Sequence, residues 1–282
     1  MPLRIVQSKQ NARLKELRKA LANPPRESAR GGGGAATLAG IEGPNLLQEA
    51  LRAGLTVDCV FVAQGAERLL ESIPLTPQTE ILLLPRELLD FALTTETPQP
   101  VAALIETPIW TWDLLLGAHQ NGTPLILVLA GLQDPGNLGA ILRSAEAFGA
   151  TGVVSLPGTV SSWNPKAVRA SAGSVFRLPL LAVPAADCFL RLREAGVKIW
   201  TTTPDTTNTN QAAAEPANLV NLTGPAAILI GNEGNGVPRP LSAMADGALT
   251  IPCPGPVESL NAAVAASILL YEASRQRAGQ PS

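Results

Sequence analysis

The sequence predicts an α/β protein made of two successive units. Along most of the chain, apolar segments of four to seven residues alternate with segments whose apolar residues recur at helical spacing. In the second half the apolar segments are nearly continuous, which is typical of parallel strands buried on both faces. A connector bounded by Pro and Gly, residues 107–124, separates the two alternations. We therefore expect one domain at 1–106, a linker at 107–124 and a second domain at 125–282.

The first unit begins with a basic helix and continues as a small α/β alternation. A run of four glycines, Gly31–Gly34, follows that helix and predicts a flexible loop. The expected strands are 36–41, 57–63, 80–84 and 101–105. Helices are expected at 44–53, 67–72 and 86–92.

The second unit has the stronger strand pattern. Strands are expected at 125–130, 152–156, 197–202, 226–230 and 248–251. Helical segments are expected at 138–148, 165–172, 186–195 and 260–277, with a short turn at 238–245. Ligands of parallel sheets bind outside the carboxyl ends of the strands, so we expect function in the loops that follow them.

Composition excludes several classes of protein. Of 282 residues, 46% are hydrophobic and 16% charged, which argues against a largely disordered chain. Aromatic residues make up only 4%, so base stacking is not expected to be the main device. Three cysteines without a CxxC pair fit a reducing cytoplasm, and a single histidine, His119, excludes a His-rich metal site. The polar, basic N-terminus and the short apolar runs predict no export signal, no membrane span and no metal.

Charge is concentrated at the N-terminus. Residues 1–30 contain eight Lys or Arg and two Glu, a net charge of +6, whereas the rest of the chain carries −8. A basic segment on an otherwise acidic protein favours a local contact with a polyanion. A solvated helical face explains the same pattern equally well.

The loop after residues 125–130 contains Pro135-Gly136-Asn137. Because Pro-Gly favours a turn, Asn137 is expected to cap the helix that follows. Arg143 falls off the apolar face of that helix, near its loop end. A lone arginine is usually solvated, but here it could meet an anion or a ribose-phosphate.

The loop after residues 226–230 reads Gly231-Asn-Glu-Gly-Asn-Gly-Val-Pro238. Its three glycines allow the backbone to approach a ligand closely. Neither GxGxxG nor GxxxxGK[ST] is present, so phosphate cradling is weakly supported. The simplest role of Glu233 is to accept backbone N–H bonds within the loop.

The loop after residues 248–251 contains three prolines and leads into the final helix. Ser259 is a natural N-cap for that helix, and Leu260, Val264, Ile268 and Tyr271 form one apolar stripe along it. Asn261 is a mediocre helix former in a first turn, which favours a functional role. Cys253 lies in the same loop without an evident base, so a nucleophilic role is disfavoured.

Together the three loops resemble the signature motifs of the SpoU (TrmH-type) RNA ribose 2′-O-methyltransferases, within the SPOUT superfamily. The matching segments are NLGAILRSAEAFGATGVV from Asn137, ILIGNEGNGVP from Ile228 and IPCPGPVESLNAAVAASILLYEASRQR from Ile251. The segment KAVRASAGSVFRLPL from Lys166 is also typical. The first half, with GIEGPNLLQEALRAG, is similar to the L30e-like substrate-binding domain of the same family; Pro100, where glycine is expected, and the Gly31–Gly34 run depart from it.

The resemblance implies an α/β fold with a C-terminal parallel-sheet SPOUT domain containing a deep trefoil knot, preceded by a small L30e-like α/β domain. It implies S-adenosylmethionine as the cofactor and a homodimer formed through the C-terminal domain. Arg143 matches the catalytic arginine, and Asn137, Glu233, Ser259 and Asn261 match the other polar motif positions. Cofactor-contacting positions are matched by Gly231, Asn232, Gly236, Ile251 and Leu260.

The activity implied is methylation of a ribose 2′-hydroxyl in structured RNA, with ribosomal RNA favoured over transfer RNA by the two-domain layout. Because arginine is very hard to deprotonate, we expect Arg143 to remain cationic while Asn137, Ser259 or a water relays the hydroxyl proton. The RNA backbone is expected to meet the basic N-terminal residues Arg4, Lys9, Arg13 and Lys15.

Two other classes remain open at this point. One is a non-catalytic RNA-binding or ribosome-assembly protein with the same fold, against which the intact polar motif residues argue. The other is a nucleotide-dependent oxidoreductase, which the missing glycine fingerprint disfavours.

Overall fold

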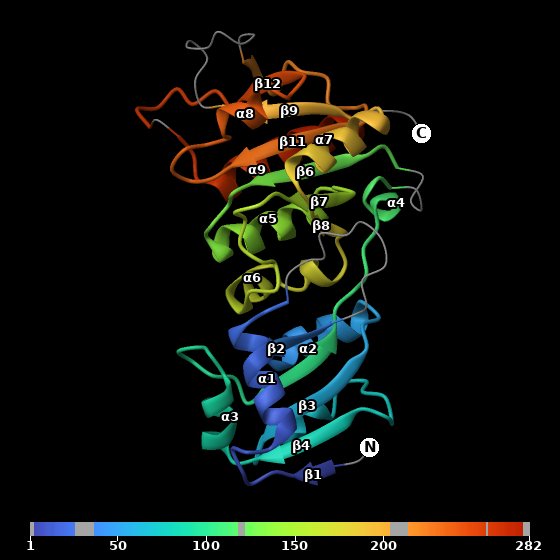
Figure 1. The fold of residues 1–282 in the computed structure, drawn as a ribbon, viewed down its shortest axis with the longest axis vertical. Coiled ribbons are helices and arrows are strands. Elements are labelled where there is room, and N and C mark those ends of the chain that lie inside the picture. Colours follow the sequence, from blue (N-terminus) through green and yellow to red (C-terminus); the bar gives the residue numbers. More distant parts are fainter. Residues whose placement is uncertain (1–2, 26–36, 118–121, 204–213, 258, 279–282) are drawn as a thin grey trace. The chain divides into compact units, whose positions relative to one another are not determined.

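A computed structural model describes residues 3–25, 37–117, 122–203, 214–257 and 259–278 (Figure 1). The Gly31–Gly34 run and His119 lie outside these ranges. Contacts divide the chain into two compact units. The first contains the described residues of Met1–Arg26 and Gly34–Ile109 together with Ser161–Arg177, and the second contains those of Trp110–Val160 and Leu178–Ser282.

The first unit is built on a mixed five-stranded sheet in the order β1-β4-β3-β5-β2. Its strands are β1 (Leu3–Ile5), β2 (Leu38–Glu42), β3 (Val57–Ala63), β4 (Glu80–Leu84) and β5 (Val101–Glu106). β1, β4 and β3 run parallel, whereas β5 is antiparallel to both β3 and β2. The helices are α1 (Ala12–Ala22), α2 (Pro44–Arg52), a 3-10 turn η1 (Glu67–Leu70) and α3 (Arg86–Ala92).

The basic N-terminal segment is part of this unit and not a detached arm. The Asn11 side chain caps α1 by accepting a hydrogen bond from the Leu14 amide (3.1 Å). Leu14, Leu17 and Leu21 recur at helical spacing and are buried in the core of the unit. β1 extends the sheet by pairing with β4, so α1 and β1 are both part of the folded unit.

The second unit is built on a seven-stranded parallel sheet in the order β10-β12-β9-β11-β6-β7-β8. Its strands are β6 (Leu125–Ala130), β7 (Gly152–Ser155), β8 (Leu180–Ala182), β9 (Lys198–Thr202), β10 (Glu215–Pro216), β11 (Ala226–Gly231) and β12 (Gly247–Thr250). Its helices are α4 (Trp112–Leu115), α5 (Pro135–Ala147), α7 (Ala185–Glu194), α8 (Arg239–Ser242) and α9 (Ala262–Ala278). Side chains of α4, α7 and α8 join one core cluster with the sheet, while α5 and α9 pack against each other and contact β7 and β11.

The parallel register fixes where the strands end. Gly231, the last residue of β11, lies opposite Ala130, the last residue of β6. β9 connects this pair to β12, because Thr201 pairs with Leu229 and Thr202 pairs with Leu249. The loops that follow β6, β11 and β12 therefore leave the sheet at one edge, as the sequence predicts.

Five short elements were not expected from the sequence. β1, β8, β10 and the 3-10 turn η2 (Ser174–Phe176) have only two or three residues, and α4 is a single turn within the expected connector. Such elements are too short to show periodicity, so tertiary contacts define them. The other elements agree with the expectations, with bounds that shift by at most three residues.

Residues 161–177, which include α6 (Pro165–Ala170) and the 3-10 turn η2 (Ser174–Phe176), make their contacts with the first unit despite following β7 in sequence. The Arg177 guanidinium donates to the Glu49 carboxylate of α2 (2.7 Å), and Trp163 stacks on Phe176. A single linker at 107–124 does not account for the membership of residues 161–177 in the first unit.

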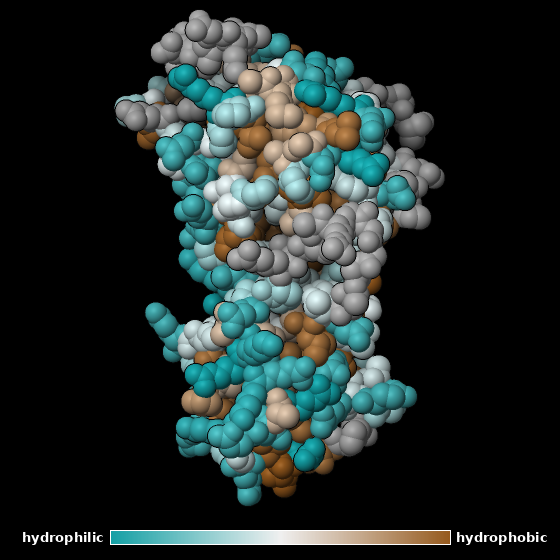
Figure 2. All heavy atoms as spheres, in the orientation of Figure 1, coloured by the Kyte–Doolittle hydropathy of each residue, from teal (hydrophilic) through white to brown (hydrophobic). Residues whose placement is uncertain are grey.

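Hydrophilic side chains alternate with scattered apolar ones on the face that Figure 2 draws, as is usual for a folded surface. None of the described helices combines the length and the apolar character needed to cross a bilayer.

We predict that Leu17→Ala destabilises the first unit by about 2–5 kcal/mol, because a fully buried leucine is lost from its core. Urea unfolding followed by circular dichroism measures the effect. Lys19→Ala, an exposed position on the same helix, is the control and should change little. Equal stabilities for the two variants would show that α1 is not part of the core.

Candidate active site

Three loops at the carboxyl edge of the second sheet are joined by one asparagine. Asn137 Nδ2 donates to Glu233 Oε1 (2.8 Å), and Asn137 Oδ1 accepts from Asn261 Nδ2 (3.0 Å). Asn137 belongs to the segment after β6, Glu233 follows β11 and Asn261 follows β12. The structure thus joins Asn137 to one residue that lies 96 positions away in the sequence and to another that lies 124 positions away.

The helix caps differ from the expected ones. This difference explains why the Asn137 side chain can form hydrogen bonds with the other two loops. Asp134, not Asn137, caps α5: its carboxylate accepts from the Asn137 amide (2.7 Å), and Pro135 starts the helix. Asn137 is therefore in the first turn, with its side chain free to reach the other loops.

The expected cap of the last helix is also wrong. α9 begins at Ala262, and Asn261 Oδ1 accepts from the amides of Ala263 (2.9 Å) and Val264 (3.3 Å). Asn261 is therefore the N-cap, and its amide nitrogen still reaches Asn137. Ser259 is exposed, and its hydroxyl makes no hydrogen bond within the described part of the chain.

The second loop folds back on itself. Asn232 and Gly236 exchange backbone hydrogen bonds (3.2 and 3.1 Å), and Asn232 Oδ1 accepts from the amides of Gly234 (3.1 Å) and Asn235 (2.7 Å). A Cβ atom on Gly231 would lie 1.9 Å from the Gly236 carbonyl carbon. Only glycine permits this close approach at residue 231, and Gly236 has a φ of +64°, which also favours glycine.

The third loop leaves its backbone available. From Ile251 to Val257, no backbone N–H or C=O group bonds to another described backbone group. Three of these residues are proline and donate nothing, so Ile251, Cys253, Gly255 and Val257 supply the N–H groups. Ile251 and Leu260 flank the loop and are half-buried. Exposed backbone groups of this kind bond to water or to a ligand.

Arg143 lies six residues after Asn137 on α5, which corresponds to about 9 Å along the helix axis. Its side chain is exposed and makes no ion pair or hydrogen bond with any described residue. The next residue, Ser144, contacts Ser267 of α9 through their hydroxyls (2.7 Å). Arg143 thus stands on a firmly packed helix with its guanidinium free to bind an anion.

The expected apolar stripe of α9 is not the face that packs on the core. Ala266, Leu269, Leu270 and Ala273 are buried, whereas Val264, Ile268 and Tyr271 are 47%, 39% and 55% exposed. The sequence reveals two apolar faces on one helix, and periodicity could not decide which one the chain buries. Phe148 packs edge-on against Tyr271, with ring centroids 5.8 Å apart.

The four expected RNA-contacting cations have different surroundings. Arg13 is held by the carboxylates of Glu16 (2.9 Å), Asp58 (2.9 Å) and Glu80 (3.2 Å). Its hydrogen bond with Glu16 and the charge of Asp58 hold its pKa above the ordinary arginine value. Arg4, Lys9 and Lys15 are exposed and are not tied to carboxylates within the described residues.

Other nucleophiles and metal ligands do not gather near the three loops. Burial raises the pKa of Cys59 and of Cys188 to about 12, so both thiols stay protonated at neutral pH. Cys253 is exposed and its thiol donates to the Ile251 carbonyl (3.4 Å). Among the residues that the structure describes, no three of His, Cys, Asp and Glu meet where they could hold a metal ion. The loops therefore offer backbone groups, an amide bridge and one free guanidinium.

Comparison with known proteins agrees with this geometry. Residues 124–271 match the model of the SpoU rRNA Methylase family. An uncharacterized tRNA/rRNA methyltransferase of Mycolicibacterium vanbaalenii is 35% identical, over 84% of this chain and 76% of its own length. The 23S rRNA (guanosine(2553)-2′-O)-methyltransferase RlmP of Bacillus subtilis is 33% identical, over 82% of this chain and 86% of its own. The crystal structure of an AdoMet-bound rRNA methyltransferase from Sinorhizobium meliloti superposes with a TM-score of 0.76 and 26% identity, covering 97% of this chain and 98% of that one.

We predict that Gly231→Ala lowers the stability of the second unit by at least about 2 kcal/mol, because its methyl group would overlap the backbone of residues 236 and 237. Thermal unfolding followed by circular dichroism measures the change. Gly234→Ala, in the same loop, adds a Cβ that meets only Asn232 Oδ1, at 4.0 Å, and should stay within about 0.5 kcal/mol of the unsubstituted protein. Indistinguishable melting curves for the two variants would contradict the close approach at residue 231.

Proposed function

The chain belongs to the SpoU rRNA methylase family, and from this premise we propose that it transfers a methyl group from S-adenosylmethionine to a ribose 2′-hydroxyl of ribosomal RNA. The observation that carries the proposal is the joining of the three loops through Asn137 at the edge of a parallel sheet. The 23S rRNA specificity of the similar RlmP protein supports ribosomal RNA over transfer RNA. A 2′-hydroxyl acceptor makes RNA, not DNA, the substrate.

The residues at this edge fit S-adenosylmethionine. The exposed backbone between Ile251 and Val257 can bond to the polar groups of the cofactor, and half-buried Ile251 and Leu260 can contact its adenine ring. Gly231, Asn232 and Gly236 form the compact second loop beside them. When bound, the cofactor supplies an electrophilic methyl group on a sulfonium, which requires neither a metal nor a covalent enzyme intermediate.

We assign Arg143 to binding the acceptor, which is the ribose to be methylated and its neighbouring phosphate. An arginine stays protonated in a protein, so its role is electrostatic: its fork binds a phosphate next to the target ribose and stabilises the negative charge that develops on the 2′-oxygen. Fixing that oxygen in line with the methyl group supplies much of the rate enhancement.

We assign the other polar residues of the three loops either to positioning the loops or to proton transfer. The Asn137 amide is occupied on both sides by Glu233 and Asn261, so these three residues position the loops. The Ser259 hydroxyl is free within the described chain, and it or a water relays the proton of the ribose hydroxyl to bulk solvent.

We extend the proposal to the fold and its assembly. The second unit is an α/β fold with a parallel sheet similar to SPOUT methyltransferases. We propose that the segments after β11 and β12 are threaded into a deep trefoil knot and that the first unit is an L30e-like RNA-binding domain. The similarity of 97% of this chain to the structure of the AdoMet-bound rRNA methyltransferase supports this proposal.

The exposed stripe of Val264, Ile268 and Tyr271 supports a homodimer formed through the C-terminal domain. Three large apolar side chains lie at helical spacing on the outer face of α9, and α9 packs on α5, which carries Arg143. A second copy covering this stripe would therefore lie close to the site.

Mapping of 2′-O-methylated riboses in total RNA tests the function. Cells that lack the gene should lose methylation at a site in ribosomal RNA, and the gene supplied in trans should restore it. An unchanged methylation pattern would reject the proposal. Loss of methylation only from transfer RNA would show that transfer RNA, and not ribosomal RNA, is the substrate.

Arg143→Lys keeps a positive charge but removes the planar fork. We predict that kcat for methyl transfer to ribosomal RNA falls by about tenfold to a hundredfold, while S-adenosylmethionine affinity by calorimetry stays the same. Arg191→Lys, on an exposed face of α7, is the control and should retain full activity. Near-normal turnover of Arg143→Lys would argue against bidentate binding.

Ile268→Glu should convert the protein to a monomer, because a charge would enter the apolar interface. Sedimentation velocity measures the change. Leu190→Glu, at a 57% exposed leucine of α7, should remain dimeric. A monomeric unsubstituted protein, or an Ile268→Glu dimer, would contradict the assignment of this face.

A further inference from the structure

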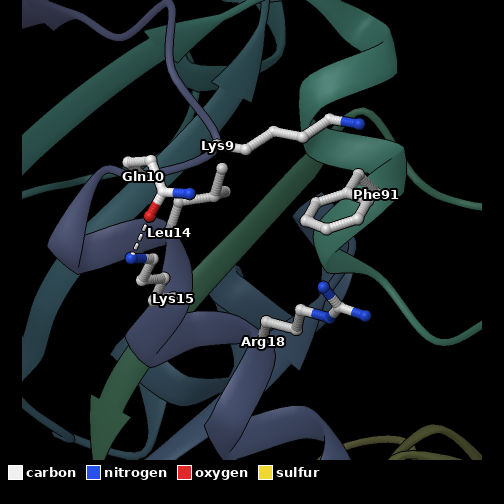
Figure 3. A pocket seen from close by; sticks show the side chains of 6 residues that line it. All are labelled: Lys9, Gln10, Leu14, Lys15, Arg18 and Phe91. Atoms are coloured by element: carbon white, nitrogen blue, oxygen red, sulfur yellow. Dashed lines mark hydrogen bonds between the residues drawn. The ribbon is translucent and has the colours of Figure 1, made fainter.

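A basic hollow lies on the first unit, whereas the residues assigned to methyl transfer belong to the second unit. It encloses about 240 Å³ between the start of α1 and the last turn of α3 (Figure 3). Its walls are formed by six residues, Lys9, Gln10, Leu14, Lys15, Arg18 and Phe91. Pockets for small-molecule ligands are usually larger, about 300–1,000 Å³, so this hollow suits one group of a longer molecule.

An exposed aromatic ring organises the cations of the hollow. Phe91 is 39% exposed, and both Lys9 Nζ (4.3 Å) and Arg18 Cζ (4.2 Å) lie over its ring, measured to the centroid. Figure 3 shows the two cations on opposite sides of the ring in this view. Lys15 donates to the Gln10 side-chain carbonyl. These contacts hold the cations in place but do not neutralise their charge.

The nearby carboxylates do not compensate the charge. Glu16 pairs with Arg13 (2.9 Å), and Asp90 pairs with Arg86 (2.8 Å). Glu87, one turn before Phe91 on α3, forms no ion pair with a described residue, but it does not line the hollow. Lys9, Lys15 and Arg18 are therefore three like charges around one small hollow, an arrangement that an anion would stabilise.

We propose that this hollow binds backbone phosphates of the RNA substrate, which deepens the proposed function and rests on it. Three cations around a space too small for a separate ligand match a polyanionic chain passing over the surface. Because the ring already restrains Lys9 and Arg18, less side-chain freedom is lost on binding. The site adds Arg18 and Phe91 to the residues expected from the sequence. It omits Arg4, which does not line the hollow, and Arg13, whose charge is satisfied by three carboxylates.

The test compares two double variants of the full chain. Lys9→Gln with Arg18→Gln removes the cations over Phe91, and Lys198→Gln with Arg191→Gln is the matched control. Lys198 also lies over an aromatic ring, that of Trp200 (4.1 Å), but in the second unit. The probe is transcribed 23S rRNA, and filter binding is measured from low to moderate salt.

The site variant should bind about tenfold more weakly at moderate salt, and its plot of log affinity against log salt should be shallower by about 1–2. The control should match the unsubstituted protein. Phe91→Leu, which keeps apolar bulk but removes the ring, should weaken binding by a smaller factor. Unchanged affinity and slope in the site variant, or an equal loss in the control, would overturn the proposal.

Two further measurements separate this inference from the proposed function. S-adenosylmethionine affinity should be unchanged in the site variant, and the melting temperature should change little, because Lys9 and Arg18 are exposed and their contacts with Phe91 contribute only modestly to stability. Binding is read without methyl transfer, so an unsubstituted protein that binds RNA through these cations but never methylates it would contradict only the proposed function.

Discussion

The arrangement of the site depends on a two-sided hydrogen bond from one amide. The side chain of Asn137 donates to Glu233 and accepts from Asn261, and so connects loops that follow three different strands. Parallel pairing brings those strands to a common edge, but each loop could still point elsewhere. Each hydrogen bond contributes only about 1 kcal/mol net, so the bridge selects among loop arrangements more than it stabilises the fold.

The two caps explain how Asn137 can play this role. Asp134 satisfies the start of α5, and Asn261 satisfies the start of α9 while its amide nitrogen reaches across. The same two helices pack together through Ser144 and Ser267, which fixes the base of Arg143 without engaging its guanidinium. The packed helices thus form a rigid support. On that support, the free guanidinium of Arg143 and the exposed backbone of residues 251–257 can each bind a ligand.

Sequence patterns predicted the long strands and helices, the common edge and the loops that form the site, because burial imposes periods of 2 and 3.6 on those segments. They could not assign the caps, since Asn137 and Asp134, or Ser259 and Asn261, are equally good cap residues. They also misassigned the buried face of α9. Both faces of this helix are apolar, and only the tertiary structure shows which one packs on the core. Charge alone could not show that Arg13 is neutralised by residues distant in sequence, such as Asp58 and Glu80.

A double-mutant cycle on Asn137 and Asn261, read as S-adenosylmethionine affinity by calorimetry, tests the central claim most directly. If the bridge holds the loops in the binding arrangement, each alanine variant binds more weakly and the double variant is little worse than the poorer single one, a coupling of about 0.5–3 kcal/mol. Additive effects, or no loss of affinity in Asn137→Ala, would contradict the account.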